Sequence, residues 1–143
     1  MRFPTYTTLM TETDQLGEHR SYLATEENFR ILGEMERNNA IVPITGDFGG
    51  PKALRSVGRY LKSRGATVTT IYTSNVEQYL FQQEDAWKRY YANVATLPID
   101  DESVFIRSAR GRNVLDPIRG LLKEFDAGRL QGYVDVTDRG AVR

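Results

Sequence analysis

The sequence predicts an α/β fold, with a Rossmann-like open, mostly parallel sheet flanked by helices. Two segments rich in apolar and β-branched residues, 41–48 and 67–74, lie on either side of a segment with helical periodicity. A strand, a helix and a strand within about 35 residues form a βαβ unit, whose right-handed crossover makes the two strands parallel. Helical and strand-like segments continue to alternate after residue 80, which is the pattern of α/β proteins.

We expect a single α/β domain, or part of one, in three sections. The chain has 143 residues, enough for a domain that buries about two-thirds of its unfolded surface. The sections are a helical lead-in, a βαβ core unit and a helix-strand-helix-strand section, at residues 1–40, 41–80 and 81–143. In the lead-in, residues 4–14 are only weakly periodic, whereas Thr25 suits the cap of a helix that ends near Arg37.

The core unit begins with a strand at 41–48. This segment is mostly apolar on both faces, as a buried parallel strand is, although Pro43 indicates an edge position or an irregularity. The helix that follows has Pro51 in its first turn and Gly65 at its C-terminal end. Its apolar stripe consists of Leu54, Val57, Gly58 and Leu61, and Gly58 permits close approach to a sheet. The second strand, 67–74, is rich in β-branched residues.

The last section alternates helices and strands. Apolar residues keep helical phase over 76–95, which predicts one helix, or two with a break near Gln82 and Gln83. A third strand is expected at 103–108. Asp116 then caps a helix that begins at Pro117 and ends at Gly128, and a final strand is expected at 132–138.

The composition excludes several classes of function. There is no cysteine, which excludes disulfides and thiolate metal sites, and the single histidine, His19, makes an ordinary zinc site a poor expectation. Lys and Arg together number 19, as do Asp and Glu, so no net field attracts nucleic acid or a membrane. No apolar run approaches the roughly 20 residues that span a bilayer, and the N-terminus does not resemble a signal peptide. We therefore expect a cytoplasmic protein.

Polar residues follow both strands of the core unit. In open α/β sheets, ligands bind beyond the carboxyl ends of the strands, where these residues should converge. Gly49 and Gly50 leave backbone N–H groups open at a helix N-terminus, a place that suits an anion. Lys52 is a cation where the helix dipole disfavours one, which indicates a ligand or an acidic partner. The ligand-binding candidates are Gly46, Asp47, Gly49, Gly50, Lys52, Ser74, Asn75 and Glu77, in which Asp47 and Glu77 would accept hydrogen bonds from hydroxyl or amino groups.

A simpler interpretation of the same corner stays open. Asp47 would only cap the helix, and the two glycines with Pro51 would only form a turn. The glycine pattern matches neither the dinucleotide fingerprint nor the P-loop. The letters GDFG occur in kinases, but the other kinase signatures are absent. No catalytic residue and no metal site can be assigned from the sequence.

Other candidates have a stronger structural alternative. A basic stripe on the central helix and an arginine cluster around Gly111 would suit phosphate or nucleic acid. The preferred interpretation is that these basic side chains are simply exposed to solvent, with their charge balanced by the acidic helix before residue 37. Trp87, Tyr90, Tyr91 and Val94 would line an aromatic pocket, although their helical spacing favours a place in the core. His19 lies in a polar stretch and is expected in an exposed loop, where it would be a proton carrier near neutral pH. The two basic sets are Lys52, Arg55, Arg59 and Lys62, and Arg107, Arg110 and Arg112.

The chain also resembles a known group of proteins. The strings "IVPITGDFGGPKALRSVGRYLKSRGATVTTIYTSNVEQYLF", "WKRYYANVATLPIDDESVFIRS" and "SYLATEENFR" are similar to the C-terminal half of an uncharacterised bacterial family. That family is grouped by fold with class I S-adenosylmethionine-dependent methyltransferases. The resemblance runs from about Pro4 to Asp135.

The resemblance implies a methyltransferase-like fold, with S-adenosylmethionine as the cofactor of the full-length proteins. It implies that 41–48 and 67–74 are the fourth and fifth strands of a wider sheet, with Asp47 near the methyl acceptor. Family members are about twice as long, and their N-terminal half supplies the glycine turn of the cofactor site. We therefore expect the chain to be a fragment of such a domain, with no established activity.

Three hypotheses of function follow. The first is a small-molecule-binding domain, part of a methyltransferase-like enzyme. The second is a non-catalytic binding or assembly module, which forms a homo-oligomer or associates through an exposed sheet edge, because unpaired edges bind further strands. The third, binding of nucleic acid, is the least expected of the three.

Overall fold

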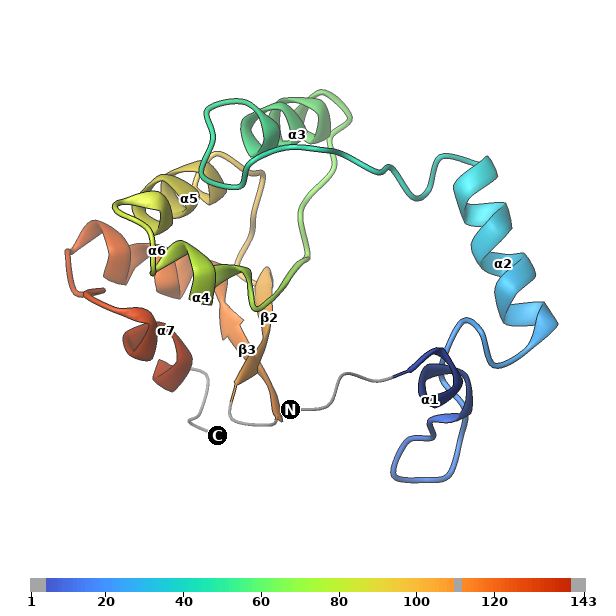
Figure 1. Cartoon of the computed structure of the whole chain (residues 1–143). Helices are drawn as coiled ribbons and strands as arrows, with labels where there is room; N and C mark the ends of the chain where they lie inside the picture. The colour runs from blue at the N-terminus through green and yellow to red at the C-terminus, as the bar shows by residue number, and fades with distance from the viewer. Residues whose placement is uncertain (1–4, 110–111, 140–143) are drawn as a thin grey trace. The chain divides into compact units, whose positions relative to one another are not determined.

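The structure, a computed structural model, describes residues 5–109 and 112–139 (Figure 1). The chain divides into two compact units, Met1–Ile44 and Thr45–Arg143. The first unit contains α1 (Tyr6–Thr11) and α2 (Glu26–Arg37). The hydroxyl of Thr25 accepts a hydrogen bond from the N–H of Asn28 at 3.0 Å, so the predicted start and end of this helix are confirmed.

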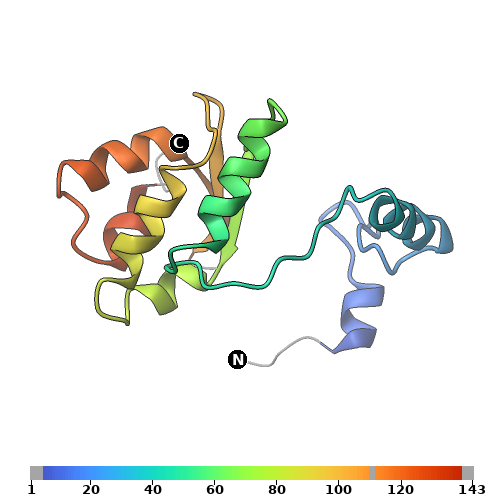
Figure 2. The same cartoon turned by 90° about the horizontal axis from the view of Figure 1, so that it is seen from above.

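The second unit is a mixed α/β structure with one small sheet. Its elements in chain order are α3 (Ala53–Ser63), β1 (Thr70–Ser74), α4 (Val76–Leu80), α5 (Ala86–Val94), β2 (Val104–Ala109), β3 (Arg112–Pro117), α6 (Ile118–Asp126) and α7 (Tyr133–Arg139). The strand order is β1-β2-β3, with β1 parallel and β3 antiparallel to β2. Helices α4, α5, α6 and α7 lie on one side of the strands (Figure 1 and Figure 2). The predicted α/β class is confirmed, but the sheet is mixed rather than mostly parallel.

The predicted strand 41–48 is wrong, and so is the βαβ unit that depended on it. Residues 42–47 form no regular structure, and Val42 and Ile44 are each 60% exposed. Pro43 has no N–H group to donate to a sheet, and apolar composition alone does not form a strand without a pairing neighbour. The parallel crossover instead joins β1 to β2 through α4 and α5.

The predicted strand 132–138 is also wrong, because these residues form α7. The carboxylate of Asp135 accepts hydrogen bonds from the N–H groups of Gln131 and Gly132, at 2.7 and 2.9 Å. Side-chain acceptors at a helix start satisfy donors that have no partner within the helix, and this favours the helix over the strand. Val136 is completely buried by the packing of α7.

Asp116 does not cap a helix as predicted. It lies in β3, a strand that no sequence pattern had indicated, and Pro117 occupies the N-cap position of α6. The helix itself is confirmed, and Gly128 follows it with φ +67°, a conformation that favours glycine. The predicted break within 76–95 is confirmed too, since α4 ends at Leu80 and α5 begins at Ala86.

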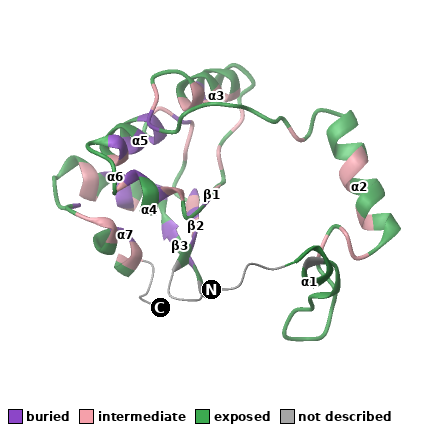
Figure 3. Ribbon diagram, viewed as in Figure 1, coloured by how far each residue is buried: buried purple, intermediate pink, exposed green. Residues whose placement is uncertain are grey.

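The core lies between the sheet and the helices (Figure 3). The predicted aromatic face of α5 is confirmed as core, because Tyr90, Tyr91 and Val94 are buried and Trp87 packs against them. Gly58 permits close approach, but to the loop after α5 rather than to the sheet. A Cβ at Gly58 would lie 3.0 Å from the carbonyl oxygen of Thr96.

Candidate functional site

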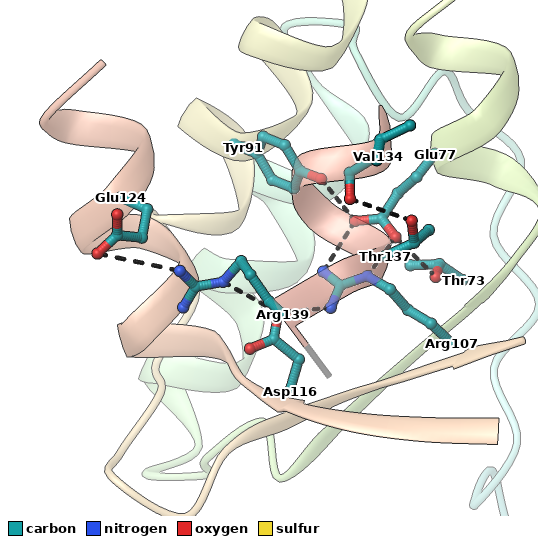
Figure 4. Close-up of polar contacts among 9 residues, drawn as sticks. All are labelled: Thr73, Glu77, Tyr91, Arg107, Asp116, Glu124, Val134, Thr137 and Arg139. Carbon is teal, nitrogen blue, oxygen red and sulfur yellow. Dashed lines mark hydrogen bonds and ion pairs between the residues drawn. The ribbon is translucent and has the colours of Figure 1, made fainter. Parts of the chain in front are cut away.

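The most unusual feature of the second unit is a buried ionic cluster, which we call the Glu77 cluster. It consists of Glu77 on α4, Arg107 on β2 and Asp116 on β3, with Tyr91 and Thr73 (Figure 4). Glu77, Arg107 and Asp116 are each no more than 2% exposed. Charged side chains are almost never buried without partners, and the geometry shows the partners here.

Every oxygen of the Glu77 carboxylate is saturated. One oxygen accepts hydrogen bonds from the Tyr91 hydroxyl at 2.7 Å and from Arg107 Nη2 at 3.0 Å. The other accepts from Arg107 Nε at 2.6 Å and from the Thr73 hydroxyl at 3.2 Å. Arg107 Nη1 donates to Asp116 at 2.7 Å, so a single guanidinium joins both carboxylates.

A second arginine lies at the edge of the cluster. Arg139 on α7 has its Nε 3.7 Å from the Asp116 carboxylate and its Nη1 3.9 Å from Glu124 (Figure 4). Its Nε is buried without a hydrogen-bond partner. Two carboxylates and two guanidinium groups therefore compensate each other's charge, which is the condition for keeping such groups in the core.

The environment shifts the pKa values of several groups in and beside the cluster. Burial lowers the pKa of Arg107, but its hydrogen bonds to Glu77 and the Glu77 charge outweigh burial and raise that pKa. Burial raises the pKa of Asp116, against the lowering effect of Arg107 and Arg139. Burial, and then the Glu77 charge, raise the pKa of the Tyr90 and Tyr91 hydroxyls far above the usual value, so both keep their protons.

The two neighbouring tyrosines differ in one respect. The Tyr91 hydroxyl donates to Glu77, whereas the Tyr90 hydroxyl is buried and has no hydrogen-bond partner. The Tyr90 ring lies edge-on to Phe48, with 6.1 Å between the ring centroids. A buried hydroxyl without a partner is rare in proteins and calls for an explanation.

Phe48 belongs to the glycine-rich loop, which is closed by its own hydrogen bonds. The Asp47 carboxylate accepts from the N–H of Gly49 at 2.9 Å, and the Asp47 carbonyl accepts from the N–H of Gly50 at 3.1 Å. The N–H groups expected to be open to an anion are thus bound within the loop. The glycines are needed for packing, since a Cβ at Gly46 would lie 2.4 Å from that of Ala53, and one at Gly49 would lie 3.2 Å from the Ala86 carbonyl oxygen.

Asn93 on α5 fixes this loop to the rest of the unit. Its amide nitrogen donates to the carbonyl oxygens of Phe48 and Gly50, at 3.0 and 2.8 Å, and its amide oxygen accepts from Arg55 at 2.8 Å. Asn93 is 1% exposed. Lys52 is exposed at the N-cap of α3, a helix start with no side-chain cap and no acid in its first turn.

The predicted site residues fall into two groups. The five from Gly46 to Lys52 lie in the loop before α3, whereas Ser74, Asn75 and Glu77 lie at the end of β1 and the start of α4. Ser74, with φ +48°, and Asn75 are exposed, whereas Glu77 is buried. No hydrogen bond between described residues joins the groups directly. Helix α5 links them, because Tyr90 contacts Phe48 and Tyr91 binds Glu77.

The weaker sequence candidates lie elsewhere. His19 is exposed as expected, with its Nδ1 3.2 Å from the Glu12 carbonyl oxygen in the first unit. The basic residues of α3 are exposed, and Arg55 and Arg59 are hydrogen-bonded to Asn93 and Ser56. Arg110 and Gly111 lie outside the described residues. Within 5–109 and 112–139, no cluster of three His, Cys, Asp or Glu residues could hold a metal ion.

Sequence reasoning missed the centre of the Glu77 cluster. Arg107 was placed with surface arginines, although it stands two residues after Phe105 in a predicted strand. Side chains two apart in a strand share a face, so an arginine in phase with a core phenylalanine was the available signal. Helical spacing placed Tyr90 in the core but gave no sign of its contact with Phe48, and Asn93 carried no signal at all, because the loop that both residues contact has a course that the sequence does not reveal.

Comparison with known proteins identifies a family without a described function. Residues 3–125 match the family described as "Domain of unknown function (DUF7790)". Comparison with curated proteins gave no match. None of the helices formed by the described residues is long and apolar enough to cross a membrane. Since the match covers most of the chain and includes Glu77, Tyr90, Tyr91 and Arg107, the protein belongs to the DUF7790 family.

Proposed function

We propose that the unit formed by residues 45–143 binds a small polar ligand beside the glycine-rich loop, where the ligand gives the Tyr90 hydroxyl its missing partner. The observation that carries this proposal is the buried, unpartnered hydroxyl, whose ring packs against Phe48 of the loop. A buried hydroxyl without a partner costs about 1–3 kcal/mol, and such costs are retained where a function needs the group.

The start of α3 supports an anionic group on the ligand. Lys52 stands at its N-cap and Arg55 follows in its first turn, and no acidic residue is present there. A helix N-terminus already favours negative charge, and two added cations strengthen that preference. The backbone N–H groups of Gly49 and Gly50 are bound within the loop, so in this proposal Lys52, Arg55 and the Tyr90 hydroxyl are the groups that would bind the ligand.

S-adenosylmethionine is the first ligand to test. The sequence resembles the C-terminal half of a methyltransferase-like family, and the cofactor's carboxylate would suit the cationic start of α3. In this proposal the three strands form part of a wider Rossmann-like sheet in a cytoplasmic protein. Asp47, Asn75 and Glu77 would lie on the acceptor side, with Glu77 acting only through Tyr91 and Arg107, since its oxygens are saturated.

Replacing Tyr90 by Phe should separate stability from binding. Loss of the unpartnered hydroxyl should leave the free energy of unfolding unchanged or raise it by up to about 1 kcal/mol. Binding of S-adenosylmethionine, measured by titration calorimetry, should weaken by about tenfold, because the ligand loses one buried hydrogen bond.

Tyr91→Phe is the matched control. It removes a hydroxyl that donates to Glu77 in the core, so the free energy of unfolding should fall by about 1–3 kcal/mol. If Tyr90→Phe destabilises the protein as much as Tyr91→Phe does, the Tyr90 hydroxyl has a structural partner. If Tyr90→Phe leaves the affinity for S-adenosylmethionine and for S-adenosylhomocysteine unchanged, neither compound binds at Tyr90.

A second candidate function is a non-catalytic assembly module, and the outer strand β1 favours it. The strand is the edge of its sheet, and the residues from Ala66 to Ser74 include no charge and no proline. Natural edge strands usually carry charged residues or prolines, because these discourage pairing with another chain. An unprotected edge is therefore a candidate for association.

A further inference from the structure

We propose that the free edge of β1 pairs with β1 of a second copy of this chain, in antiparallel orientation about a two-fold axis at Tyr72. The inference names the partner in the assembly proposal and rests on it. It is an alternative to the wider Rossmann-like sheet of the first proposal, because further strands of that sheet would cover the edge of β1. It does not involve the Tyr90 hydroxyl, which lies on the helical side of the sheet. A two-fold pairing of identical edge strands is necessarily antiparallel.

The backbone N–H and C=O groups of β1 alternate between β2 and the free edge, as such pairing requires. The carbonyl oxygen of Thr69 accepts from the N–H of Val104, at 2.9 Å, and therefore points toward β2. Because successive backbone groups along a strand alternate in direction, the N–H and C=O groups of Thr70 and Tyr72 point to the free edge. Two copies centred on Tyr72 would exchange both of its hydrogen bonds. The regular part of the strand ends there, because the register with β2 shifts between Tyr72 and Ser74, and Ser74 has φ +48°.

The two edges of the sheet differ in how they are protected. The outer strand β3 contains Asp116 and ends at Pro117, whereas β1 contains no charged residue and no proline. Charges and prolines blunt an edge against pairing, so β1 is the edge left open. The absence of charge also makes β1 self-complementary, because no like charges meet across the two-fold axis.

The side chains of the surrounding face fit the same pairing. Tyr72 on β1, Ile106 on β2 and Leu115 on β3 are aligned by the strand register on the face opposite the buried side chains. Tyr72 and Leu115 are each 62% exposed, one at either end of this row. Edge pairing would extend the row across both copies and bring the two tyrosines side by side. Aromatic cross-strand pairs stabilise sheets.

The position of Tyr72 permits a sharp test. The chain has no cysteine, so Tyr72→Cys introduces a single thiol. In a hydrogen-bonded antiparallel pair the two Cα atoms are about 5.5 Å apart, which lies within the range for a disulfide. Mild oxidation should therefore convert Tyr72→Cys to a covalent dimer in non-reducing gels. Leu115→Cys, with the same exposure in the same row, should stay monomeric in those gels.

Sedimentation of the full chain without ligand gives the second measurement. The wild type should show a concentration-dependent dimer, and Tyr72→Lys should weaken it by about tenfold or more, because two lysines would face each other across the pair. Leu115→Lys should leave the dimer unchanged. A monomeric wild type overturns the inference. Equal weakening by Tyr72→Lys and Leu115→Lys also overturns it, since the sheets would then associate through their faces.

Discussion

Replacing Arg107 by Met should destabilise the second unit by about 3–5 kcal/mol, the loss expected when one partner of a buried ion pair is removed. Arg107 is 1% exposed and donates three hydrogen bonds, two to Glu77 and one to Asp116. Methionine fills much of the volume but leaves both carboxylates without their main partner. Chemical denaturation monitored by circular dichroism gives the free energy of unfolding.

Arg119→Met is the matched control for this prediction. Arg119 also makes an ion pair, 2.6 Å from Asp101, but the two side chains are 46% and 88% exposed. Solvent already stabilises such charges, so this substitution should change the free energy of unfolding little. Equal effects of Arg107→Met and Arg119→Met would contradict a stabilising Glu77 cluster.

A triple variant tests why the loss is large. Arg107→Met combined with Glu77→Gln and Asp116→Asn removes the unpaired charges together with their partner. Neutral amides are less costly to bury than carboxylates, so the triple variant should be more stable than Arg107→Met alone. If it is less stable, the loss arises from packing around Arg107 rather than from stranded charge.

The helices of this chain could largely be predicted from its sequence. Thr25 and the acidic first turn fixed the start of α2, and the apolar periodicity of 76–95 located α5 and its core face. Gly65 and Gly128 marked the ends of α3 and α6, and both adopt positive φ. These signals are local, since a cap or a repeat acts within one or two turns of its own helix.

The strands were harder because pairing decides them. The segment 41–48 has the composition of a strand but finds no partner, whereas β3, at 112–117, is stabilised by β2 although its sequence mixes charge, polar groups and proline. The 132–138 segment alternates like a strand, yet Asp135 closes the start of a helix there. Whether a neighbouring strand exists is a property of the whole fold, which a local pattern does not contain.

The candidate site shows the same division. The sequence indicated that Glu77 follows a strand, which is confirmed, whereas it placed Asp47 at the end of a strand, 41–48, that does not form. Their roles depend on residues distant in the chain. Arg107 saturates Glu77 from 30 positions away, and Asn93 holds the loop from 43 and 45 positions away. Such long-range polar contacts define the site, and they became visible only with the fold.

Replacing Asn93 by Asp should destabilise the unit by about 2–4 kcal/mol and release the glycine-rich loop. The amide nitrogen of Asn93 donates to the carbonyl oxygens of Phe48 and Gly50, and aspartate has no donor to replace it. A buried carboxylate would instead face two carbonyl oxygens, which repel it. Hydrogen exchange should show faster exchange at the N–H groups of Gly49 and Gly50.

Asn113→Asp is the control of identical chemistry, because Asn113 is exposed on β3 and should tolerate the change. If Asn93→Asp costs no more than Asn113→Asp, the amide does not hold the loop. The variant also tests the ligand proposal, since Phe48 reaches Tyr90 only while the loop is held. A released loop with unchanged affinity for S-adenosylmethionine would place any binding of that cofactor away from Tyr90. Loss of both together would show that the loop, through Asn93, forms one wall of the site.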